Sequence, residues 1–368
     1  MMKINKENWE YKSFLSCIEK VPKPKQLTTS DYKKSGAIPI VSQDAKLITG
    51  YTNHEELKNK FDKPVIVFGD HTRVLKYIDF DFVVGADGVK IIIPKGNLLT
   101  KFLYYFLVWH KILNLGYARH FKLLKDIMIP IPPINTQNYF ISLFDKYQDL
   151  IFLKQKQLKE FDSLESSVFI KMFGDSVVKE MGWEVKSLGE IGNIITGSTP
   201  STKDKENYEP KEYCFVKPSD LPSKGVANIT TTEYFVSSKG FALSRALPIG
   251  SVLISCIGTI GKIGILKQVA CSNQQINAII PNRTIDSYYL AYNIAVNKNK
   301  LESMANAPVV PIINKTSFSL FKIAIPPLSL QQSFAQKIEV IEKQKEVVKN
   351  EIAQLQALLD SEMDKYFG

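Results

Sequence analysis

A five-residue stretch combines several side chains that can bind a polar ligand. These residues, which directly follow the apolar run VIVF, are Gly69, Asp70, His71, Thr72 and Arg73. An arginine can form two hydrogen bonds with guanine, and a carboxylate can accept a hydrogen bond from cytosine. The stretch is therefore a candidate loop for reading the edges of bases. A solvated hairpin turn, in which Asp and Thr bond their own backbone, explains the same residues equally well.

A corresponding turn with the sequence CIGTIGK occurs in the second half of the chain and supplies Thr259 and Lys262. Its glycines allow the backbone to approach a ligand closely. Three adjacent amides follow at Asn273, Gln274 and Gln275. Amide side chains can pair with N6 and N7 of adenine or with phosphates. The same amides could cap the end of a strand, so both interpretations remain open.

Isolated polar residues extend the set of candidates. Lys217 and Asp220 stand where a strand meets a turn in the sequence FVKPSDL. Weaker candidates for contact with phosphates or bases are Tyr51, Arg119, His120 and Lys122. Taken singly, each of these weaker candidates is better explained as ordinary surface.

The sequence shows no recognisable catalytic or metal site. A methyltransferase acting on an amino group would have a polar residue, two prolines and an aromatic residue in a row, but both Pro-Pro pairs here are flanked by aliphatic residues. Gly258, Gly261 and Gly264 match neither the dinucleotide fingerprint nor the phosphate loop. The four cysteines form no C-x-x-C motif, and the four histidines are not at metal-ligand spacing. We therefore predict no catalytic residue, no bound cofactor and no metal in this chain.

The charge of the chain is unevenly distributed. The net charge of +10 and the pI of about 9.1 favour an anionic partner. Lys and Arg outnumber Asp and Glu by eight in residues 1–134 and by four in residues 175–322, whereas residues 323–368 carry two more acidic than basic side chains. No apolar run approaches the ~18 residues of a membrane span. We expect a reduced, cytoplasmic protein that is neither secreted nor inserted in a membrane.

The elements that must position these residues occur in two copies. Residues 129–174 recur without a gap 194 residues later, at 323–368. Each copy begins with a Pro-Pro entry that cannot be helical and then contains no proline or glycine until its last residue. This pattern predicts two long helices. Identical pairs lie at both ends of the copies and include Pro132/Pro326, Pro133/Pro327, Gln137/Gln331, Phe140/Phe334, Phe173/Phe367 and Gly174/Gly368.

The two predicted helices carry an apolar seam with spacings of 3, 4 and 7, which is typical of coiled coils. The seam residues are Phe140, Phe144, Tyr147, Ile151, Leu158, Phe161, Leu164, Val168 and Met172 in the first helix and Phe334, Ile338, Ile341, Val348, Ile352, Leu355, Leu359 and Met363 in the second. A helix from Thr136 to Phe173 would be ~57 Å long. We predict antiparallel packing of one helix on the other; two separate homodimer zippers are the alternative.

The segments before the helices read as mixed α/β domains. Short β-branched runs are cut by Gly, Asp and Asn, and each cluster of strands is followed by an aromatic run, Phe102 to Trp109 or Tyr288 to Val296. We expect these runs to form core helices and not stacking platforms. The predicted fold is α+β, with two tandem mixed α/β domains, a long antiparallel two-helix coiled coil and a pseudo-twofold internal repeat. The predicted segments are 1–128, 129–174, 175–322 and 323–368.

With these residues assembled, the chain resembles the specificity (S) subunit of Type I restriction-modification systems over essentially its whole length. The motifs that carry the resemblance in the first half are the WE-x-KS opening, VPKPKQ, GYTNHEE, VFGDHT and IPIPPINTQNYF. In the second half they are WE-x-KS again, FVKPSDL, ISCIGTIGKIG, SNQQINAIIP and IAIPPLSLQQSF. The doubled order of variable domain, Pro-Pro entry and helix is the most specific feature.

The resemblance implies that residues 1–128 and 175–322 are target-recognition domains, each reading one half of a bipartite site in double-stranded DNA. The helices would set the spacing and dock two modification subunits, which bind S-adenosylmethionine and methylate adenine at N6. Restriction and translocase subunits would add ATP- and Mg²⁺-dependent steps in phage defence, and this chain would be non-catalytic. The alternatives are a DNA-modifying enzyme with an unrecognised active site and a coiled-coil adaptor that does not bind DNA.

Overall fold

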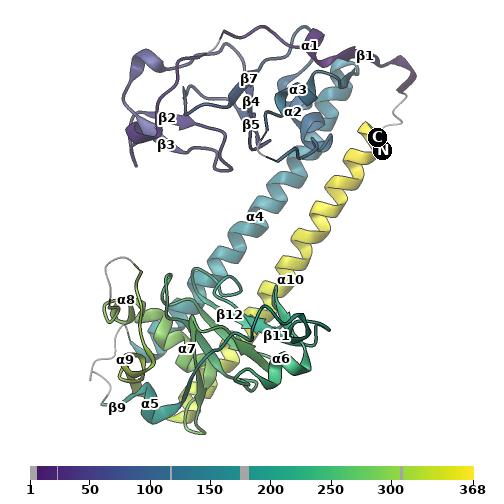
Figure 1. The fold of residues 1–368 in the computed structure, drawn as a ribbon. Helices are drawn as coiled ribbons and strands as arrows, with labels where there is room; N and C mark the ends of the chain where they lie inside the picture. Colours follow the sequence, from purple (N-terminus) through teal and green to yellow (C-terminus); the bar gives the residue numbers. More distant parts are fainter. Residues whose placement is uncertain (1–5, 23, 117, 175–181, 307–309) are drawn as a thin grey trace. The chain divides into compact units, whose positions relative to one another are not determined.

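The computed structural model describes two compact units (Figure 1). The first unit consists of Met1–Lys154 and Glu351–Gly368, and the second of Gln155–Asn350. Both units therefore contain a globular segment and parts of the two long helices. The described residues are 6–22, 24–116, 118–174, 182–306 and 310–368. The start of the second predicted domain at 175–181 and Lys23 of the VPKPKQ motif lie outside them. The boundaries of the four predicted segments stay a prediction.

The two long helices have equal lengths and equivalent bounds. Helix α4 (Ile134–Phe173) and helix α10 (Leu328–Phe367) each contain 40 residues. Both begin directly after a Pro-Pro pair, because proline disfavours the helical conformation of the residue before it. Gly174, which follows α4, has a φ of 83°, and its amide donates to the carbonyl of Ile170. A glycine in this left-handed conformation ends a helix without the strain that a Cβ atom would cause.

The helices pair with each other in antiparallel fashion, as predicted. In the first unit the start of α4 meets the end of α10, where the rings of Phe140 and Tyr366 are 4.5 Å apart. In the second unit the end of α4 meets the start of α10, where Phe173 and Phe334 are 5.5 Å apart. These contacts explain why the identical residues lie at both ends of the repeat: the last turns of one helix always pack on the first turns of the other.

Short strands form the globular segment of the first unit. They make a sheet in the order β3-β2-β6, a sheet in the order β5-β4-β7 and the ribbon β1-β8. The strands are β1 (Glu10–Ser13), β2 (Ile38–Val41), β3 (Gly50–Thr52), β4 (Val65–Gly69), β5 (Leu75–Ile78), β6 (Val83–Val84), β7 (Val89–Ile92) and β8 (Met128–Ile131). The helices are α1 (Phe14–Cys17), α2 (Thr100–Trp109) and α3 (Phe121–Leu124), with short 3-10 turns η1 (Lys6–Asn8), η2 (Thr29–Asp31) and η3 (Glu55–Leu57).

The second unit contains a larger sheet in the order β10-β17-β14-β15-β12, a sheet in the order β13-β11-β16 and the ribbon β18-β9. The strands are β9 (Glu184–Ser187), β10 (Gly192–Thr196), β11 (Tyr213–Val216), β12 (Val226–Ile229), β13 (Phe235–Val236), β14 (Val252–Ser255), β15 (Ile263–Leu266), β16 (Ala270–Ser272), β17 (Ile276–Pro281) and β18 (Lys322–Ile325). The helices are α5 (Leu188–Ile191), α6 (Ser238–Ala242), α7 (Ser287–Val296), α8 (Lys298–Glu302) and α9 (Lys315–Ser319), with the 3-10 turn η4 (Lys205–Asn207).

The aromatic runs form core helices, as predicted. Phe102 and Tyr105 of α2 and Tyr289 of α7 are buried. Helix α2 packs on β4 and β5, and α7 packs on β14 and β15. The predicted fold of two tandem mixed α/β domains with an internal repeat is therefore confirmed, and each aromatic helix joins a sheet to the long helices.

One glutamine fastens the first globular segment to α4. Gln137 is fully buried in the first turn of the helix. Its Oε1 accepts a hydrogen bond from the amide of Leu99, the residue that caps α2, at 2.8 Å. Its Nε2 donates to the carbonyls of Asn97 and Pro132, both at 2.9 Å. The side chain thus holds the start of α2 against the Pro-Pro entry.

Gln331 makes the equivalent set of bonds in the second unit. Its Oε1 accepts from the amide of Asp286, which caps α7, at 2.9 Å. Its Nε2 donates to the carbonyls of Thr284 at 3.2 Å and Pro326 at 2.8 Å. The two domains are consequently attached to the two helices by the same mechanism, although their loops differ in sequence.

Candidate functional site

The loop between β4 and β5 carries the first predicted cluster. Asp70 directly follows β4 and is only 3% exposed. Its Oδ1 accepts from the amide of Phe121 at 2.8 Å, and its carbonyl accepts from the amide of His120 at 2.8 Å. The Asp70 carboxylate therefore fixes the start of α3 to the end of β4.

His120 is fully buried beside Asp70. Its Nε2 accepts a hydrogen bond from the amide of Leu115 at 3.1 Å, so the ring proton resides on Nδ1. Nδ1 then donates to the carbonyl of Asp70 at 3.0 Å. The partners of Asp70 and His120 are thus backbone groups of the same unit. Direct DNA contact by these two side chains stays a prediction.

Gln43, which the sequence reasoning missed, organises the same loop. Its carbonyl accepts from Oγ1 of Thr72 at 2.6 Å, and its Oε1 accepts from the amide of His71 at 3.3 Å. Its Nε2 donates to the carbonyl of Asp87 at 3.1 Å. A Cβ atom at Gly69 would lie 2.2 Å from Thr72 Oγ1, so only glycine fits there. The glycine was visible in the sequence, but its neighbour Gln43 had no distinguishing motif.

The other predicted residues of the first unit differ in exposure. Arg73 has a φ of 63° and donates from its guanidinium to the carbonyl of Ile112 at 3.1 Å. Arg119 and Lys122 are exposed on either side of His120. Tyr51 is half-buried in β3, where it pairs with Pro39 of β2. The structure therefore gathers Asp70 to Arg73 with the 119–122 segment, while Tyr51 belongs to a different sheet.

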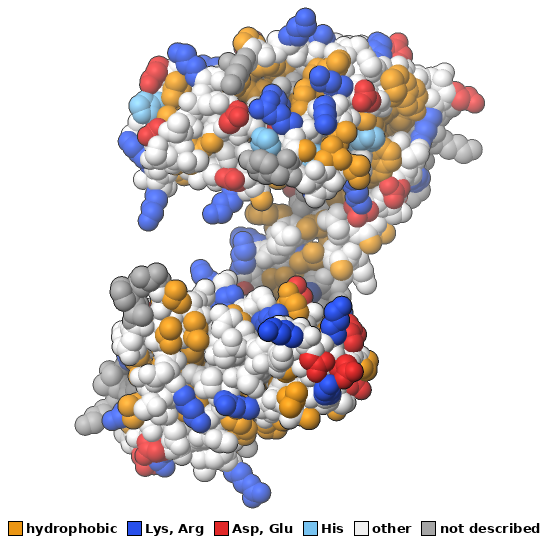
Figure 2. Space-filling view, viewed as in Figure 1, with side chains coloured by type: hydrophobic (Ala, Val, Ile, Leu, Met, Phe, Trp, Pro, Cys, Tyr) orange, Lys and Arg blue, Asp and Glu red, His pale blue; other side chains and the backbone are white. Residues whose placement is uncertain are grey.

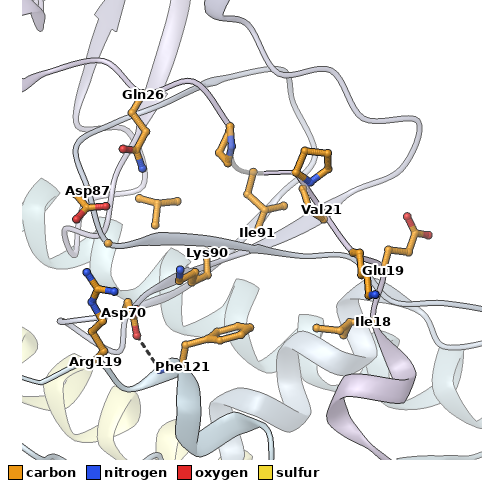
Figure 3. A pocket seen from close by; sticks show the side chains of 15 residues that line it. Ile18, Glu19, Val21, Gln26, Asp70, Asp87, Lys90, Ile91, Arg119 and Phe121 are labelled. Carbon is orange, nitrogen blue, oxygen red and sulfur yellow. Dashed lines mark hydrogen bonds between the residues drawn. The ribbon is translucent and has the colours of Figure 1, made fainter.

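A cleft of about 480 Å³ lies beside this loop (Figure 3). Its lining includes three exposed cations, Lys20, Lys90 and Arg119. Figure 3 shows Arg119 and Asp87 at one end, Glu19 at the other and Lys90 between them. The Glu19 carboxylate is paired with Lys63 at 2.7 Å, so part of the acidic lining is neutralised by its own salt bridge.

In the second unit, the turn after β11 is held by Asp220. Its Oδ2 accepts from the amide of Lys217 at 2.7 Å, and its Oδ1 accepts from the amide of Glu233 at 3.0 Å. Lys262, in the loop between β14 and β15, donates from Nζ to the carbonyl of Pro218 at 2.9 Å. The Lys262 bond joins two loops whose bonded residues are 44 positions apart in the sequence.

The predicted amide cluster joins the same loops. The amide of Asn273 donates to the carbonyl of Val216 at 3.1 Å, and its Nδ2 donates to Oε1 of Gln275 at 2.8 Å. Asn273 is buried, whereas Gln274 is exposed and accepts from Oγ1 of Thr199 at 2.6 Å. Asn273 and Gln275 thus support the loop, and Gln274 presents its amide to solvent.

Two polar residues of the same unit that the sequence reasoning missed, Tyr234 and Arg245, are also exposed. The Lys217 ammonium lies 3.1 Å from the ring centroid of Tyr234, whose side chain is partly exposed. Arg245 is exposed and donates to the carbonyl of Thr196 at 2.6 Å. The predicted residue Thr259 is exposed at the tip of the β14–β15 loop. None of the missed residues belongs to a distinct sequence motif.

Charge is the feature that both units share. Figure 2 shows Lys and Arg side chains distributed over the visible face of each unit. Among the described residues, no group of three or more His, Cys, Asp and Glu side chains could hold a metal ion. Within the same part of the chain, no helix is long and apolar enough to cross a membrane.

Comparison with known proteins gives consistent matches over nearly the whole chain. The family model described as Type I restriction modification DNA specificity domain matches residues 6–161 and again residues 180–357. The EcoR124I/EcoR124II specificity subunit of Escherichia coli is 27% identical over 346 residues, covering 85% of this chain and 80% of that protein. The HindI specificity subunit of Haemophilus influenzae is 29% identical over 160 residues, covering 43% of this chain and 35% of that protein.

Solved structures share the fold at low sequence identity. The crystal structure of a Type I restriction-modification S subunit from M. genitalium superposes with a TM-score of 0.56 and 16% identity, covering 100% of this chain and 98% of that one. A chain from a study of complex assembly and conformational transition of the Type I R-M system gives the same TM-score and identity, with 98% of both chains covered.

Proposed function

This chain belongs to the Type I restriction modification DNA specificity family, and from that premise we propose that each globular segment reads one half of a bipartite sequence in double-stranded DNA. One observation carries the proposal. In both units a β-hairpin loop, after β4 or after β14, lies at the centre of a polar cluster, and equivalent buried glutamines, Gln137 and Gln331, fasten the two domains to the long helices. Two recognition surfaces of different sequence are thus built on one scaffold.

The first half-site is read, in this proposal, by the β4–β5 loop and the adjoining cleft. Lys20, Lys90 and Arg119 contact phosphates, because cations of this kind supply the sequence-independent part of DNA affinity. His71, Thr72, Arg73 and Lys122 approach the DNA from the loop side. Asp70 and His120 act by positioning the loop, and Tyr51 is an outlying contact on β3.

The second half-site is read by the loops around β14. Gln274, Thr259 and Lys217 supply the contacts, and Thr199, Tyr234 and Arg245 extend the surface around them. Asp220, Lys262, Asn273 and Gln275 position these loops through the hydrogen bonds described above. An exposed amide such as Gln274 can pair with adenine, whereas a lysine favours guanine or phosphate.

The partner surface lies, in the same proposal, on the outer faces of the helices. Leu150, Phe152 and Leu153 of α4 are 46%, 65% and 56% exposed. A contiguous patch of exposed apolar side chains marks a site of protein contact. We assign such surfaces to two modification subunits that bind S-adenosylmethionine and methylate adenine at N6. Restriction and translocase subunits would use ATP and Mg²⁺, while this chain supplies no catalytic residue or cofactor.

Sequencing of modified bases tests the proposal. A host strain carrying the chain and its modification subunits should contain N6-methyladenine in a bipartite motif. A matched strain that lacks only this chain should lose that methylation. An unchanged methylation pattern would contradict the proposal, and methyl transfer by the purified chain alone would support the alternative of a DNA-modifying enzyme.

A further inference from the structure

A salt bridge is buried in the helix interface of the second unit. Nζ of Lys345 on α10 lies 3.1 Å and 3.3 Å from the two carboxylate oxygens of Glu165 on α4. Glu165 is 1% exposed and Lys345 is 7% exposed. Asp162 and Glu342 also approach Lys345, at 2.9 Å and 2.8 Å. An ion pair at such depth gives little net stability, because both charges lose their hydration.

The internal repeat shows what occupies the equivalent place in the first unit. Counting 194 residues along the repeat, Lys345 corresponds to Ile151, and Glu165 corresponds to Leu359. Ile151 and Leu359 are both buried in the core of the first unit, at 8% and 1% exposure. The same position of the seam therefore holds an apolar pair in one unit and a charged pair in the other.

This difference bears on which helices can pair. Helices α4 and α10 have the same length, the same entry and the same terminal anchors, so a second copy of the chain could offer its α4 to the α4 of the first. In such an antiparallel pair, Glu165 of each copy would face Ile151 of the other. A pair of two α10 helices would likewise place Lys345 against Leu359.

In both homotypic pairs a buried charge loses the opposite charge that faces it: Glu165 would meet Ile151, and Lys345 would keep only Glu342 of its own helix. By symmetry each would contain two such mismatches, and an unpaired buried charge is far less favourable than a paired one. An all-apolar seam would tolerate every combination of α4 and α10. The charged pair is compatible only with the combination of one α4 and one α10, which is how specificity is commonly set between similar helices.

We propose that Glu165 and Lys345 make the helix interface selective for unlike helices and so exclude a second copy of this chain from α4–α4 and α10–α10 pairing. The proposal concerns assembly and does not depend on the DNA-binding function. It assigns a role to a pair of charges that neither the predicted recognition sites nor the hydrophobic seam explains.

Refolding of the full-length chain provides the test. The variant Glu165→Leu/Lys345→Ile copies the apolar pair of the first unit into the second. Wild type and variant are unfolded, refolded at pH 8 over a range of protein concentrations and sized by light scattering. We expect the fraction of dimer in the variant to rise about tenfold or more relative to wild type. An equal dimer fraction in the two proteins would overturn the proposal.

The control reverses the charges. Glu165→Lys/Lys345→Glu keeps one unlike pair in each chain and should refold like wild type. A rise in dimer equal to that of the apolar variant would mean that any change at this site promotes association, which would also overturn the proposal.

A mixing experiment gives an independent readout if the apolar variant refolds poorly. Glu165→Lys alone and Lys345→Glu alone each place like charges together within the chain. Refolded as a mixture, they can exchange helices and restore two unlike pairs. We expect a species of twice the chain mass, containing one copy of each variant, only in the mixture. Identical mass distributions in the mixed and separate samples would contradict the selectivity of the pair.

Discussion

Gln137 shows how one side chain can connect a variable domain to a constant helix. Replacement by leucine keeps most of the side-chain volume but leaves the Leu99 amide and the carbonyls of Asn97 and Pro132 without their partner. Buried groups left unsatisfied in this way cost about 1 to 3 kcal/mol each. We therefore expect Gln137→Leu to lower the free energy of unfolding by at least about 2 kcal/mol, measured by urea denaturation. Gln148→Leu, at an exposed position of the same helix, is the control and should change stability little.

Glu165 should make the stability of the chain depend on pH near neutrality. Burial, followed by the neighbouring Glu342 carboxylate, raises the pKa of Glu165 from 4.5 to about 7, and the opposing effects of Lys345 and Tyr292 are smaller. The native state therefore binds more protons than the unfolded state between these values. Stability contributed at this site is present at low pH and declines as the pH rises through the window.

The comparison variant is Glu165→Gln, which does not titrate. Relative to this variant, the wild type should lose up to about 3 kcal/mol of unfolding free energy between pH 5 and pH 7.5. Urea denaturation of both proteins at the two pH values measures the difference. Parallel changes in wild type and variant would show that another group is responsible.

Three different elements contribute the cations of the cleft. Lys20 comes from the segment before β2, Lys90 from β7 and Arg119 from the residues before α3. Alanine at Lys20, Lys90 or Arg119 should weaken binding to all DNA sequences alike, and each phosphate interaction removed should reduce the slope of log affinity against log salt by about 1. Fluorescence anisotropy at several salt concentrations measures this slope. Lys156→Ala, an exposed lysine on α4, should leave the slope unchanged.

The two hairpin loops should specify independent halves of the target. Exchange of residues 71–73 for those of another target-recognition domain should change the half-site read by the first unit and leave the other half intact, because His71, Thr72 and Arg73 form hydrogen bonds with groups of their own unit. Gln274→Ala is the matched change in the second unit. Sequencing of methylated motifs reports both halves at once, and changes in both from one substitution would contradict independent reading.

The elements themselves were largely predictable from local sequence. The Pro-Pro pairs and the terminal glycines bound α4 and α10, since these residues act on their own backbone. The runs around VIVF and VLIS became the central strands β4 and β14. Their hydrophobic, β-branched character is sufficient to indicate a buried strand.

The candidate site was less predictable, because the conformation of its loops depends on hydrogen-bond partners that are distant in sequence. The Asp70 carboxylate accepts a hydrogen bond from the amide of Phe121, and the Thr72 hydroxyl donates one to the carbonyl of Gln43. These partners lie 51 and 29 residues away in sequence. The residue types predicted a polar loop, but they did not indicate which of its side chains reach solvent. Arg245 and Thr199 were missed for the same reason, since isolated polar residues carry no spacing signal.

At the scale of the whole molecule, the internal repeat gives every chain two recognition domains and two helices of equal length. The helices contribute 40 residues each and carry little net charge, whereas the positive excess lies in the two globular segments. Domains with positive charge and loops of different sequence suit two different DNA half-sites. Helices of fixed length suit a fixed number of unread base pairs between the two half-sites. The length of the helices can be changed without altering either recognition loop.

Removal of one heptad from each helix tests this role. Deletion of residues 155–161 together with 349–355 keeps the seven-residue spacing of the seam and spares both Glu165 and Lys345. At 1.5 Å per residue, seven residues correspond to ~10 Å of helix, or ~3 base pairs at 3.4 Å each. We expect the methylated motif to retain both half-site sequences and to lose about 3 base pairs of spacer.

Deletion of a heptad from α4 alone is the control for the paired deletion. This change places the seam residues of the two helices out of register and separates Glu165 from Lys345, so it should lower stability and methylation without producing a new spacing. The paired deletion instead keeps the seam of α4 in register with the seam of α10. The methylated DNA motif should then be shorter but equally well defined. Altered half-sites with an unchanged spacer would show that the helices do not determine the spacing, because the only segments removed lie outside every recognition loop.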